Sequence, residues 1–499
     1  MKVLITVGSK RATIDGSFPK DDVDNALSAY VKGYQFSPQF KQRRKDGSRV
    51  WDGKMRLFSR VTNSFPVGVL DIVCDVLKTH KITYELHRPY LDELDLPKDI
   101  REKWISGQWE IPDQVGPFLL YDYQKEAIKE FLNPLRPLPY RGVIKIATGG
   151  GKTAVGATIA KIVNQPTLFL VHGKKLGRQN LEVFRKIFAG NEDLIGVIDS
   201  ENWTPSQVTI ASSDTLFSRM KNIQYEDKLS DFFNSIVFTI ADECHRATSK
   251  SFADILKAVN APMRLGLSGT PNKKEDDRDL LLHSLTGDII YEMGVSELKK
   301  VGTISKAHLL GVIIKEPTGF EELDWQEAFT SLVINNGFRH DIIAKLISQR
   351  ANDQRTILVL AGNSLDLAQN IYDRARKFIN EDNIRLVNGL SHDKYVDETF
   401  KKLQDKELTC VVTTTIADEG IDIPSVNTLI LAGGGKSFVR TVQRVGRSLR
   451  LKEDGSDAEI IDILDTTNPY LKKHSRARLD YYNEENLFDT AKSVMARNV

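Results

Sequence analysis

Residues 143–153 read VIKIATGGGKT, an apolar run followed by three glycines, a lysine and a threonine. The apolar run is typical of a buried strand, and the residues from Ala154 onward have the pattern of a helix. The glycines therefore fall at a strand-to-helix turn, where backbone N–H groups and the amino end of the helix can face an anion. The stretch predicts a phosphate-binding turn inside a parallel α/β sheet.

An acidic pair, Asp242 and Glu243, follows the near-continuous apolar run of residues 236–241. Carboxylates at the end of a buried strand can hold a magnesium ion and activate a water molecule. We expect Asp242 and the hydroxyl of Thr153 to hold Mg²⁺, and Glu243 to polarise the attacking water. Lys152 would reach the β- and γ-phosphates. The two motifs together predict the binding and hydrolysis of a nucleoside triphosphate, which is ATP in our interpretation.

The chain has 499 residues, enough for about three domains. Residues 1–90 mix short strand-like and helix-like runs, as in a small α+β module, and residues 91–117 are charged and proline-spotted, as in a linker. From residue 118 apolar strands alternate with longer amphipathic helices, and the alternation restarts after about residue 304. The pattern predicts an α/β fold with two tandem parallel-sheet domains, residues 118–303 and 304–480, followed by a tail at 481–499.

Individual elements are predicted from the same runs. In residues 1–90 we expect strands at 2–7, 54–61 and 81–86 and helices at 21–31 and 68–80. In the first sheet domain the strand candidates are residues 143–147, 167–171, 207–211, 236–241 and 264–268. In the second they are residues 307–314, 356–360, 384–386, 409–413, 428–431 and 459–464.

Composition limits the classes of protein. The net charge is only +2, but residues 41–60 hold eight Lys or Arg against two Asp, and residues 472–478 form a second basic run. Three distant cysteines match neither a metal site nor a disulfide framework, which favours a reducing cytoplasm, that of the host if a phage encodes the chain. No run approaches the roughly 20 apolar residues of a membrane span. We therefore expect no membrane partner.

The set of motifs resembles the superfamily-two helicases. Residues 147–153 match their phosphate loop, and further motifs stand in the family's order at 123–124, 171–179, 212–216, 242–245, 268–270, 363–364 and 413–424. The resemblance covers about residues 115–455 and implies two RecA-like domains that use ATP to move along nucleic acid.

The resemblance also implies roles for individual residues. ATP binding is implied for Gln124, Thr148, Gly149, Gly150, Gly151, Lys152, Thr153, Gly420 and Asp422. Nucleic-acid binding is implied for His172, Gly173, Lys174, Arg178, Ser213, Thr215, Asn363, Thr413 and Thr414. Coupling of hydrolysis to movement is implied for His245, Ser268 and Thr270.

Residues 443–450 read QRVGRSLR, and on a helix Gln443, Arg447 and Arg450 would share one face at positions i, i+4 and i+7. In the family the ATP lies between two domains and the second supplies arginines, so the resemblance implies catalytic roles for these three residues. An arginine on the γ-phosphate can be worth ~10³–10⁵ in rate. The alternative is a solvated basic face. Gly446 disfavours it, because a glycine inside a helix costs about 1 kcal/mol.

The N-terminal module bears on the substrate. Residues 33–40, GYQFSPQF, and 51–57, WDGKMRL, resemble the N-terminal domain of phage recombination helicases, which implies action on branched DNA. Arg43, Arg44, Arg49 and Lys54 are the candidate contacts, because cations neutralise phosphate. The aromatic residues between them can stack on bases, but we interpret most of them as the core of a small domain.

The expected function is therefore that of an ATP-dependent DNA helicase or translocase that unwinds, regresses or migrates branched DNA in recombination, repair or replication. Three alternatives stay open: an RNA helicase of the same superfamily, a double-strand translocase or restriction motor that does not separate strands, and a nucleic-acid-binding scaffold with a regulatory ATP switch. We expect a monomer or weak associate, with a single-strand-binding protein as a candidate partner.

Overall fold

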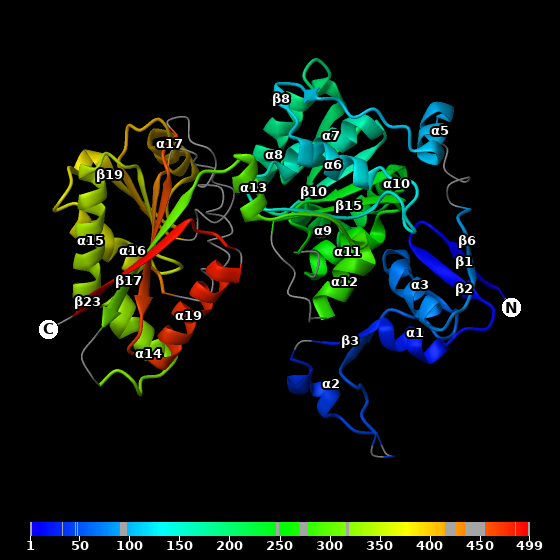
Figure 1. Ribbon diagram of the computed structural model, residues 1–499, viewed down its shortest axis with the longest axis horizontal. Coiled ribbons are helices and arrows are strands. Elements are labelled where there is room, and N and C mark those ends of the chain that lie inside the picture. The colour runs from blue at the N-terminus through cyan, green and yellow to red at the C-terminus, as the bar shows by residue number, and fades with distance from the viewer. Residues whose placement is uncertain are drawn as a thin grey trace. The chain divides into compact units, whose positions relative to one another are not determined.

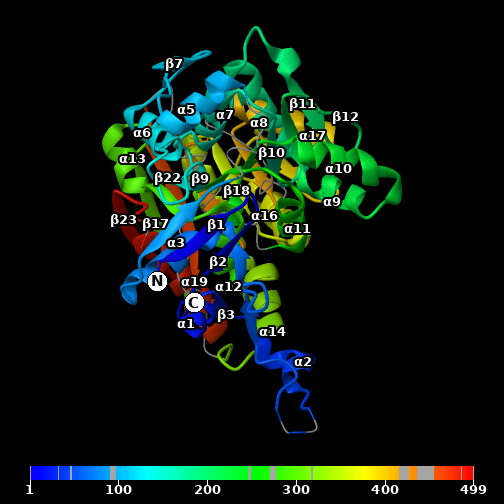
Figure 2. The ribbon, with the colours of Figure 1, turned by 90° about the vertical axis from the view of Figure 1, so that its right-hand side faces the viewer.

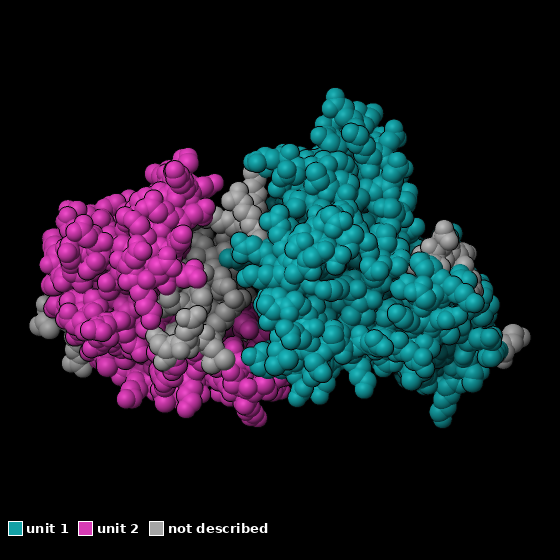
Figure 3. Space-filling model, turned by 90° about the horizontal axis from the view of Figure 1, so that it is seen from above, with its two compact units in different colours: residues 1–146, 151–292 teal, residues 147–150, 293–499 magenta. Residues whose placement is uncertain are grey.

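The computed structural model describes residues 2–31, 33–44, 46, 48–89, 97–245, 249–269, 277–315, 319–414, 426–434, 455–484 and 486–497. The chain divides into two compact units, shown in different colours in Figure 3. Unit 1 comprises residues 1–146 and 151–292, and unit 2 comprises residues 147–150 and 293–499. The two units are described separately below.

The N-terminal module, residues 2–89, is built on a four-stranded sheet in the order β5-β2-β1-β6. Alternate residues of β1 are buried, because successive side chains of a strand point to opposite faces. The buried side chains of β1 share one apolar core with those of helix α3. The bounds are β1 (Val3–Val7), β2 (Arg11–Asp15), α1 (Lys20–Ala26), β5 (Ser64–Pro66), η2 (Val67–Val69), α3 (Leu70–Thr79) and β6 (Tyr84–His87).

A hairpin arm, residues 28–56, leaves this module after α1. Its base is the antiparallel pair of β3 (Ser28–Tyr30) and β4 (Lys54–Arg56), and between them lie η1 (Tyr34–Phe36) and α2 (Pro38–Lys41). Figures 1 and 2 show α2 beyond β3, away from α1 and α3. The prediction of one helix over 21–31 is wrong in its second half. Residues 28–30 pair with residues 54–56 instead, because tertiary pairing overrides the local helical pattern.

The N-terminal module packs against the sheet domain of the same unit. The guanidinium of Arg141, at the start of β9 (Arg141–Ile146), donates a hydrogen bond to the backbone carbonyl of Ser9. Gly68 lies so close to α12 (Asp277–Thr286) that a Cβ there would overlap the carbonyl oxygen of His283. The ring of His283 in turn places Nε2 3.0 Å from Oδ1 of Asp71. The module and the sheet domain therefore form one compact unit.

The sheet domain of unit 1 has eight strands in the order β12-β11-β13-β10-β14-β15-β9-β16. The pairs from β11 to β9 are parallel, and the short β12 is antiparallel to β11. Figure 1 shows helices on either side of this sheet. The strands are β9 (Arg141–Ile146), β10 (Thr167–Val171), β11 (Ile195–Ile198), β12 (Trp203–Thr204), β13 (Val208–Ser212), β14 (Phe238–Ala241), β15 (Met263–Ser268) and β16 (Ile289–Met293).

The helices of this domain are α6 (Asp122–Phe131), α7 (Lys152–Val163), α8 (Lys174–Ile187), α9 (Ser213–Met220), α10 (Glu226–Ser235), α11 (Lys250–Ala258) and α12 (Asp277–Thr286). The five strands predicted here are confirmed with small shifts at their ends. The segment 91–117, expected to be a linker, contains helix α5 (Lys98–Ser106). Its Trp104 is buried and stacks on Tyr140 with ring centroids 5.0 Å apart, so this part is packed onto unit 1.

Unit 2 is built on a seven-stranded, all-parallel sheet in the order β19-β20-β18-β21-β22-β17-β23. Ile357 and Val359 of β18 belong to one core cluster, whereas Leu358 and Leu360 belong to another. Both faces of the sheet are thus covered, which explains the continuous apolar runs in its sequence. The strands are β17 (Ala307–Lys315), β18 (Ile357–Leu360), β19 (Ile384–Val387), β20 (Cys410–Thr413), β21 (Thr428–Leu431), β22 (Ala458–Asp465) and β23 (Thr490–Arg497).

The helices of unit 2 are α13 (Val295–Val301), α14 (Trp325–Phe329), α15 (Gly337–Asn352), α16 (Leu365–Ala375), α17 (Asp393–Gln404) and α19 (Pro469–Glu484). The predicted tail over 481–499 is wrong, because β23 pairs in parallel with β17 along eight residues. Four of its eight residues are polar and its side chains from Thr490 to Met495 are exposed, as on the edge of a sheet, so its sequence lacks a long apolar run. The fold is nonetheless the predicted one, with two tandem RecA-like domains after a small α+β module.

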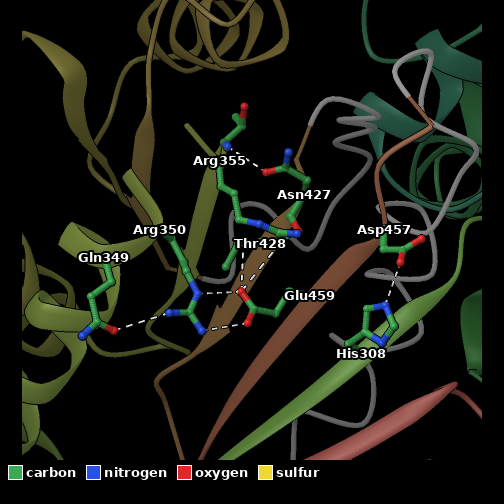
Figure 4. Close-up of polar contacts among 9 residues, drawn as sticks. His308, Gln349, Arg350, Arg355, Asn427, Thr428, Asp457 and Glu459 are labelled. Carbon is green, nitrogen blue, oxygen red and sulfur yellow. Dashed lines mark hydrogen bonds and ion pairs between the residues drawn. The ribbon is translucent and has the colours of Figure 1, made fainter. Parts of the chain in front are cut away.

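A polar network lies where β17, β21 and β22 of unit 2 begin (Figure 4). The guanidinium of Arg350 donates two hydrogen bonds of 2.8 Å to the carboxylate of Glu459. Burial raises the pKa of Glu459, but the hydrogen bonds and charge of Arg350, with the charge of Arg355, lower it further, so the pKa lies below its usual range. His308 and Asp457 form a second pair, 2.8 Å apart.

No helix among the described residues is long and apolar enough to cross a membrane.

Candidate nucleotide and nucleic-acid sites

Residues 147–151 form the turn between β9 and α7, where the sequence predicts phosphate binding. Gly149 and Gly151 have φ angles of +94° and +78°, a region that residues with a Cβ rarely adopt. Thr148 and Gly150 lie in the same turn, and α7 begins at Lys152. The glycines thus allow the chain to reverse from the sheet directly into the amino end of a twelve-residue helix.

Gln124 lies against this turn. Its side chain is buried, and Oε1 accepts a hydrogen bond of 3.1 Å from the backbone N–H of Tyr121 at the start of α6. A Cβ on Gly151 would overlap Nε2 of Gln124. Gly151 is therefore required twice, once by its backbone angle and once by the side chain of Gln124. The two residues, which are 27 positions apart in the sequence, fix each other's place.

A chain of hydrogen bonds joins the first turn of α7 to the end of β14. The hydroxyl of Thr153 donates to Oδ1 of Asn180 over 3.1 Å, and Nδ2 of Asn180 donates to Oδ2 of Asp242 over 3.0 Å. Asn180 and Asp242 are only 6% and 4% exposed, so these bonds lie in a poorly solvated place. The two oxygen ligands predicted from the sequence, on Thr153 and Asp242, are thus held around one amide.

Glu243 takes an unusual backbone conformation directly after Asp242, with φ of +48°. Its N–H donates to Oδ1 of Asp242 over 3.0 Å, and its own carboxylate lies 4.0 Å from Nζ of Lys152. The ring of His245 places Nδ1 3.3 Å from the other carboxylate oxygen of Glu243 and 3.4 Å from the hydroxyl of Ser268. Left-handed backbone at a non-glycine residue is concentrated at functional sites.

Cys244, between the two acidic residues and His245, faces the core instead. It is fully buried, and burial together with the charges of Glu243 and Asp242 raises the pKa of its thiol far above the ordinary value. A thiol in this state is neither a nucleophile nor a metal ligand. A Cβ on Gly266 of β15 would lie 2.9 Å from its sulfur, so Cys244 serves close packing between β14 and β15.

Asn180 is the site residue that sequence reasoning missed. Helix α8 buries Phe184 and Ile187, which lie four and seven positions after Asn180 and share its face. A polar residue at a position that the pattern reserves for an apolar one is the signal that could have identified it.

Other predicted residues follow the neighbouring strands of unit 1. Nδ1 of His172, after β10, lies 3.4 Å from the hydroxyl of Ser213 at the start of α9, and Ser213 is fully buried. Thr215 lies on α9, half-buried. Gly173 caps the amino end of α8, whose first turns include Lys174 and Arg178. These residues stand at the carboxyl ends of β10 and β13, one strand or two beyond β14 in the sheet.

The residues predicted in the second domain stand at the carboxyl ends of β18 and β20. Asn363, three residues after β18, is exposed, whereas Thr413 and Thr414 are buried. The hydroxyl of Thr413 donates to the carbonyl of Thr414 over 3.1 Å. Six predicted residues lie outside the described residues: Thr270, Gly420, Asp422, Gln443, Arg447 and Arg450.

The two basic runs differ. Arg43, Arg44 and Arg49 of the hairpin arm are exposed, and Lys54 is half-buried. In the run 472–478 the last residue, Arg478, is buried and donates from Nε to Oδ2 of Asp462 over 2.9 Å. The second run therefore serves the core of unit 2 at one of its positions, and the arm presents the more exposed charge.

Family models match both sheet domains. Residues 118–273 match the model described as "Type III restriction enzyme, res subunit", and residues 339–452 match the helicase conserved C-terminal domain. The order of the two models is the order of the two parallel-sheet domains in the chain. Neither match includes the N-terminal module or the hairpin arm.

Individual proteins are similar over most of the chain. The DNA 3'-5' translocase XPB2 of Sulfurisphaera tokodaii is 25% identical over 74% of this chain and 88% of its own. The ATP-dependent DNA helicase uvsW of Enterobacteria phage T4 is 23% identical over 94% of each chain. A fragment of a putative HsdR subunit of a type I restriction enzyme from Vibrio vulnificus shares the fold, with a TM-score of 0.59, 18% identity and 91% of both chains covered.

The glycine turn between β9 and α7, the acidic pair at the end of β14 and the order of the two family models agree with one another. One of the similar proteins is named a DNA 3'-5' translocase and another an ATP-dependent DNA helicase. The chain belongs to the superfamily-two helicases and is an ATP-hydrolysing helicase.

Proposed function

We propose that this chain is an ATP-dependent DNA translocase that acts on branched DNA, where it unwinds, regresses or migrates junctions. The observation that carries the motor part is the Thr153–Asn180–Asp242 chain beside Glu243, at the end of a phosphate-binding turn. The branched-DNA part rests on the N-terminal module. Its aromatic and basic stretch resembles that of phage recombination helicases, and the T4 helicase aligns over 94% of both chains.

In this proposal the turn at residues 147–151 and residues of unit 1 divide the work on ATP. The N–H groups of the turn and Nζ of Lys152 bind the phosphates. Thr153 and Asp242 offer the hard oxygen donors that suit Mg²⁺, and Asn180 orients both side chains. When bound, Mg²⁺ neutralises phosphate charge. Gln124 holds the shape of the turn through its contact with Gly151.

Glu243 is proposed to hold and polarise the attacking water. Its carboxylate lies 4.0 Å from Nζ of Lys152, and bound phosphates would compete for that lysine and release the carboxylate. His245 joins Glu243 to Ser268 at the end of β15. The contacts of His245 with Glu243 and Ser268 therefore give a path by which loss of the γ-phosphate would be transmitted to the end of β15. The roles of Gln443, Arg447, Arg450, Gly420, Asp422 and Thr270 stay predictions from the sequence.

The proposal is tested by ATP hydrolysis in the presence of single-stranded DNA, forked DNA, a four-way junction, linear duplex or RNA, with Lys152→Ala as the control. We expect stimulation by DNA, and unwinding or migration of the fork and the junction, both abolished by Lys152→Ala. Stimulation by RNA alone would overturn the DNA assignment. DNA-stimulated hydrolysis retained by Lys152→Ala would overturn the assignment of the ATP site.

A double-strand translocase is the second candidate, favoured by the match of residues 118–273 to the restriction-enzyme motor subunit and by the similarity to a DNA translocase. The two candidates differ in what they displace. A translocase on intact duplex removes a third strand from a triplex without opening a fork, whereas a junction helicase opens the fork. The same protein preparation should be tested on both substrates.

A further inference from the structure

The hairpin arm of unit 1 lies outside both matched family regions. It is joined to the module by β3 and β4, and Val31 continues this ladder by donating to the carbonyl of Gly53 over 2.8 Å. Further along, the backbone N–H of Arg44 donates to the carbonyl of Ser48 over 2.7 Å. The arm is thus a hydrogen-bonded hairpin rather than an irregular loop.

An aromatic stack runs inside the arm. The rings of Tyr30 and Tyr34 are stacked 4.9 Å apart, and the ring of Phe40 meets Tyr34 edge-on at 4.8 Å. Gly53 lies against Tyr34, where a Cβ would overlap the ring. The guanidinium of Arg49 covers Phe40 at 3.7 Å from the ring centroid. This stack replaces an ordinary core and fixes the segment between Tyr30 and Phe40.

Phe36 is left out of this stack. It ends η1, where its N–H donates to the carbonyl of Gly33 and the N–H of Ser37 donates to the carbonyl of Tyr34, both over 3.0 Å. These bonds fix its backbone, yet its side chain is 79% exposed. The sequence interpretation that the aromatic residues of this stretch are mostly core therefore fails for Phe36. A lone exposed phenylalanine needs no explanation by itself, so its surroundings decide.

The arm that carries Phe36 is strongly basic. Residues 28–56 contain eight Lys or Arg and two Asp, a net charge of +6, whereas the whole chain carries +2. Both Asp residues interact with other residues of the arm. Asp52 forms an ion pair with Arg56, and Asp46 accepts two hydrogen bonds from Ser48. The arm therefore combines a net positive charge with a fixed, exposed ring, which complements a polyanion that carries flat rings.

We propose that Phe36 stacks on an unpaired base of a DNA strand whose phosphates bind the basic side chains of the hairpin arm, Arg44 and Arg49 among them. The inference rests on the proposed function and adds to it the residue that recognises the unpaired strand. A base in a duplex offers only its edges to a protein, whereas an unpaired base also offers its face. The arm would thus distinguish the single-stranded part of a fork from its duplex arms.

The base held by Phe36 would keep a fixed relation to the first sheet domain. The arm is joined to the module by the β3–β4 pair, and the module is joined to β9 and α12 through Arg141 and Gly68. All of these belong to unit 1. A strand gripped by the arm is therefore carried with the first sheet domain when that domain moves.

The test uses the full chain with Phe36→Leu, Phe36→Trp and the control Val61→Ser. Val61 belongs to the same module and is 95% exposed, but it lies outside the arm. The probes are a single-stranded oligonucleotide and a fork with 2-aminopurine at unpaired positions, and a blunt duplex of the same sequence. Binding is measured by titration, stacking by the fluorescence of 2-aminopurine, and folding by circular dichroism.

We expect the wild-type protein to quench the fluorescence of the unpaired probe. Phe36→Leu should lose the quenching and bind the single strand and the fork about tenfold more weakly, the size of one base–aromatic stack, with binding to the duplex unchanged. Phe36→Trp should restore both signals, and Val61→Ser should behave as wild type. Equal affinity and quenching in Phe36→Leu and wild type, or equal losses on all three probes, would overturn the inference. A wild-type protein without DNA-stimulated ATP hydrolysis would instead contradict the proposed function, whatever Phe36→Leu does.

Discussion

Nδ2 of Asn180 donates a hydrogen bond of 3.0 Å to Oδ2 of Asp242, although the two residues, one on helix α8 and one directly after strand β14, are 62 positions apart. Both side chains are almost completely buried. The bond fixes which way the carboxylate points, and it leaves the other oxygen to the N–H of Glu243. Asn180 is therefore a positioning residue for the acidic pair.

The first prediction concerns Asn180→Ala. Loss of the amide leaves the carboxylate of Asp242 without its orienting donor, and we expect ATP hydrolysis to fall about 10- to 100-fold, as for other partners that orient metal ligands. The Mg²⁺ concentration that gives half of the maximal rate should rise. A merely structural role would lower the melting temperature without changing that concentration. Asn234→Ala, at an exposed position of α10, is the control.

Glu243→Gln is the second prediction. The amide keeps the size of the side chain but cannot polarise water, so the turnover of ATP should fall by about 10²–10⁴. Binding of ATP should be kept or improved, because the carboxylate near Lys152 no longer competes with the phosphates for the lysine. Single-turnover hydrolysis and binding of a fluorescent ATP analogue separate the two effects. Weakened binding with unchanged turnover would show that Glu243 serves the structure only.

Much of the fold follows from local sequence, for a physical reason. Strands buried on both faces need continuous apolar runs, and the predicted strands Thr167–Val171 and Thr428–Leu431 have the predicted bounds. Parallel strands also bring their carboxyl ends to one edge, which is why Lys152 and Glu243 could be grouped from the sequence.

The rest depends on contacts that local sequence does not contain. Asn180 could be assigned to the site only once the face of α8 was known to turn toward the end of β14. Only half of the residues of the edge strand β23 are apolar, and its pairing with β17 across about 180 positions has no local signal. Phe36 resembles its neighbours Tyr34 and Phe40 in sequence, and only the packing of the arm separates the exposed ring from the two half-buried ones.

Gly151→Ala is the third prediction. At a φ of +78° a Cβ costs about 1–3 kcal/mol, and this Cβ would also overlap the amide of Gln124. We expect ATP binding to weaken more than about tenfold, since about 1.4 kcal/mol corresponds to a factor of ten. Gly190→Ala measures the free-energy cost of a Cβ at such a backbone angle by itself, because Gly190 has a φ of +85° and open space around a Cβ.

The double variant Gly151→Ala with Gln124→Ala divides the two causes further. It removes the overlap but keeps the backbone strain, so part of the ATP affinity should return if the contact with Gln124 matters. An affinity in the double variant no better than in Gly151→Ala would show that the backbone angle alone requires the glycine.

The last prediction concerns the pH dependence of unit 2, measured as thermal unfolding from pH 7 to pH 3. Arg350 and Arg355 hold the pKa of Glu459 below its ordinary value of 4.5 in the folded state, against the effect of burial. A carboxylate with a depressed folded pKa adds stability at pH values above its unfolded pKa. That contribution is lost as the pH falls below 4.5 through the folded pKa.

Arg350→Ala should therefore destabilise unit 2 by about 1–3 kcal/mol at pH 7, and the difference in stability between the variant and wild type should narrow below pH 4.5. Arg376→Ala, which removes an exposed ion pair with Glu381, should change stability by less than about 1 kcal/mol at any pH. A gap between Arg350→Ala and wild type that stays constant from pH 7 to pH 3 would show that the arginine stabilises unit 2 by packing and not by its charge.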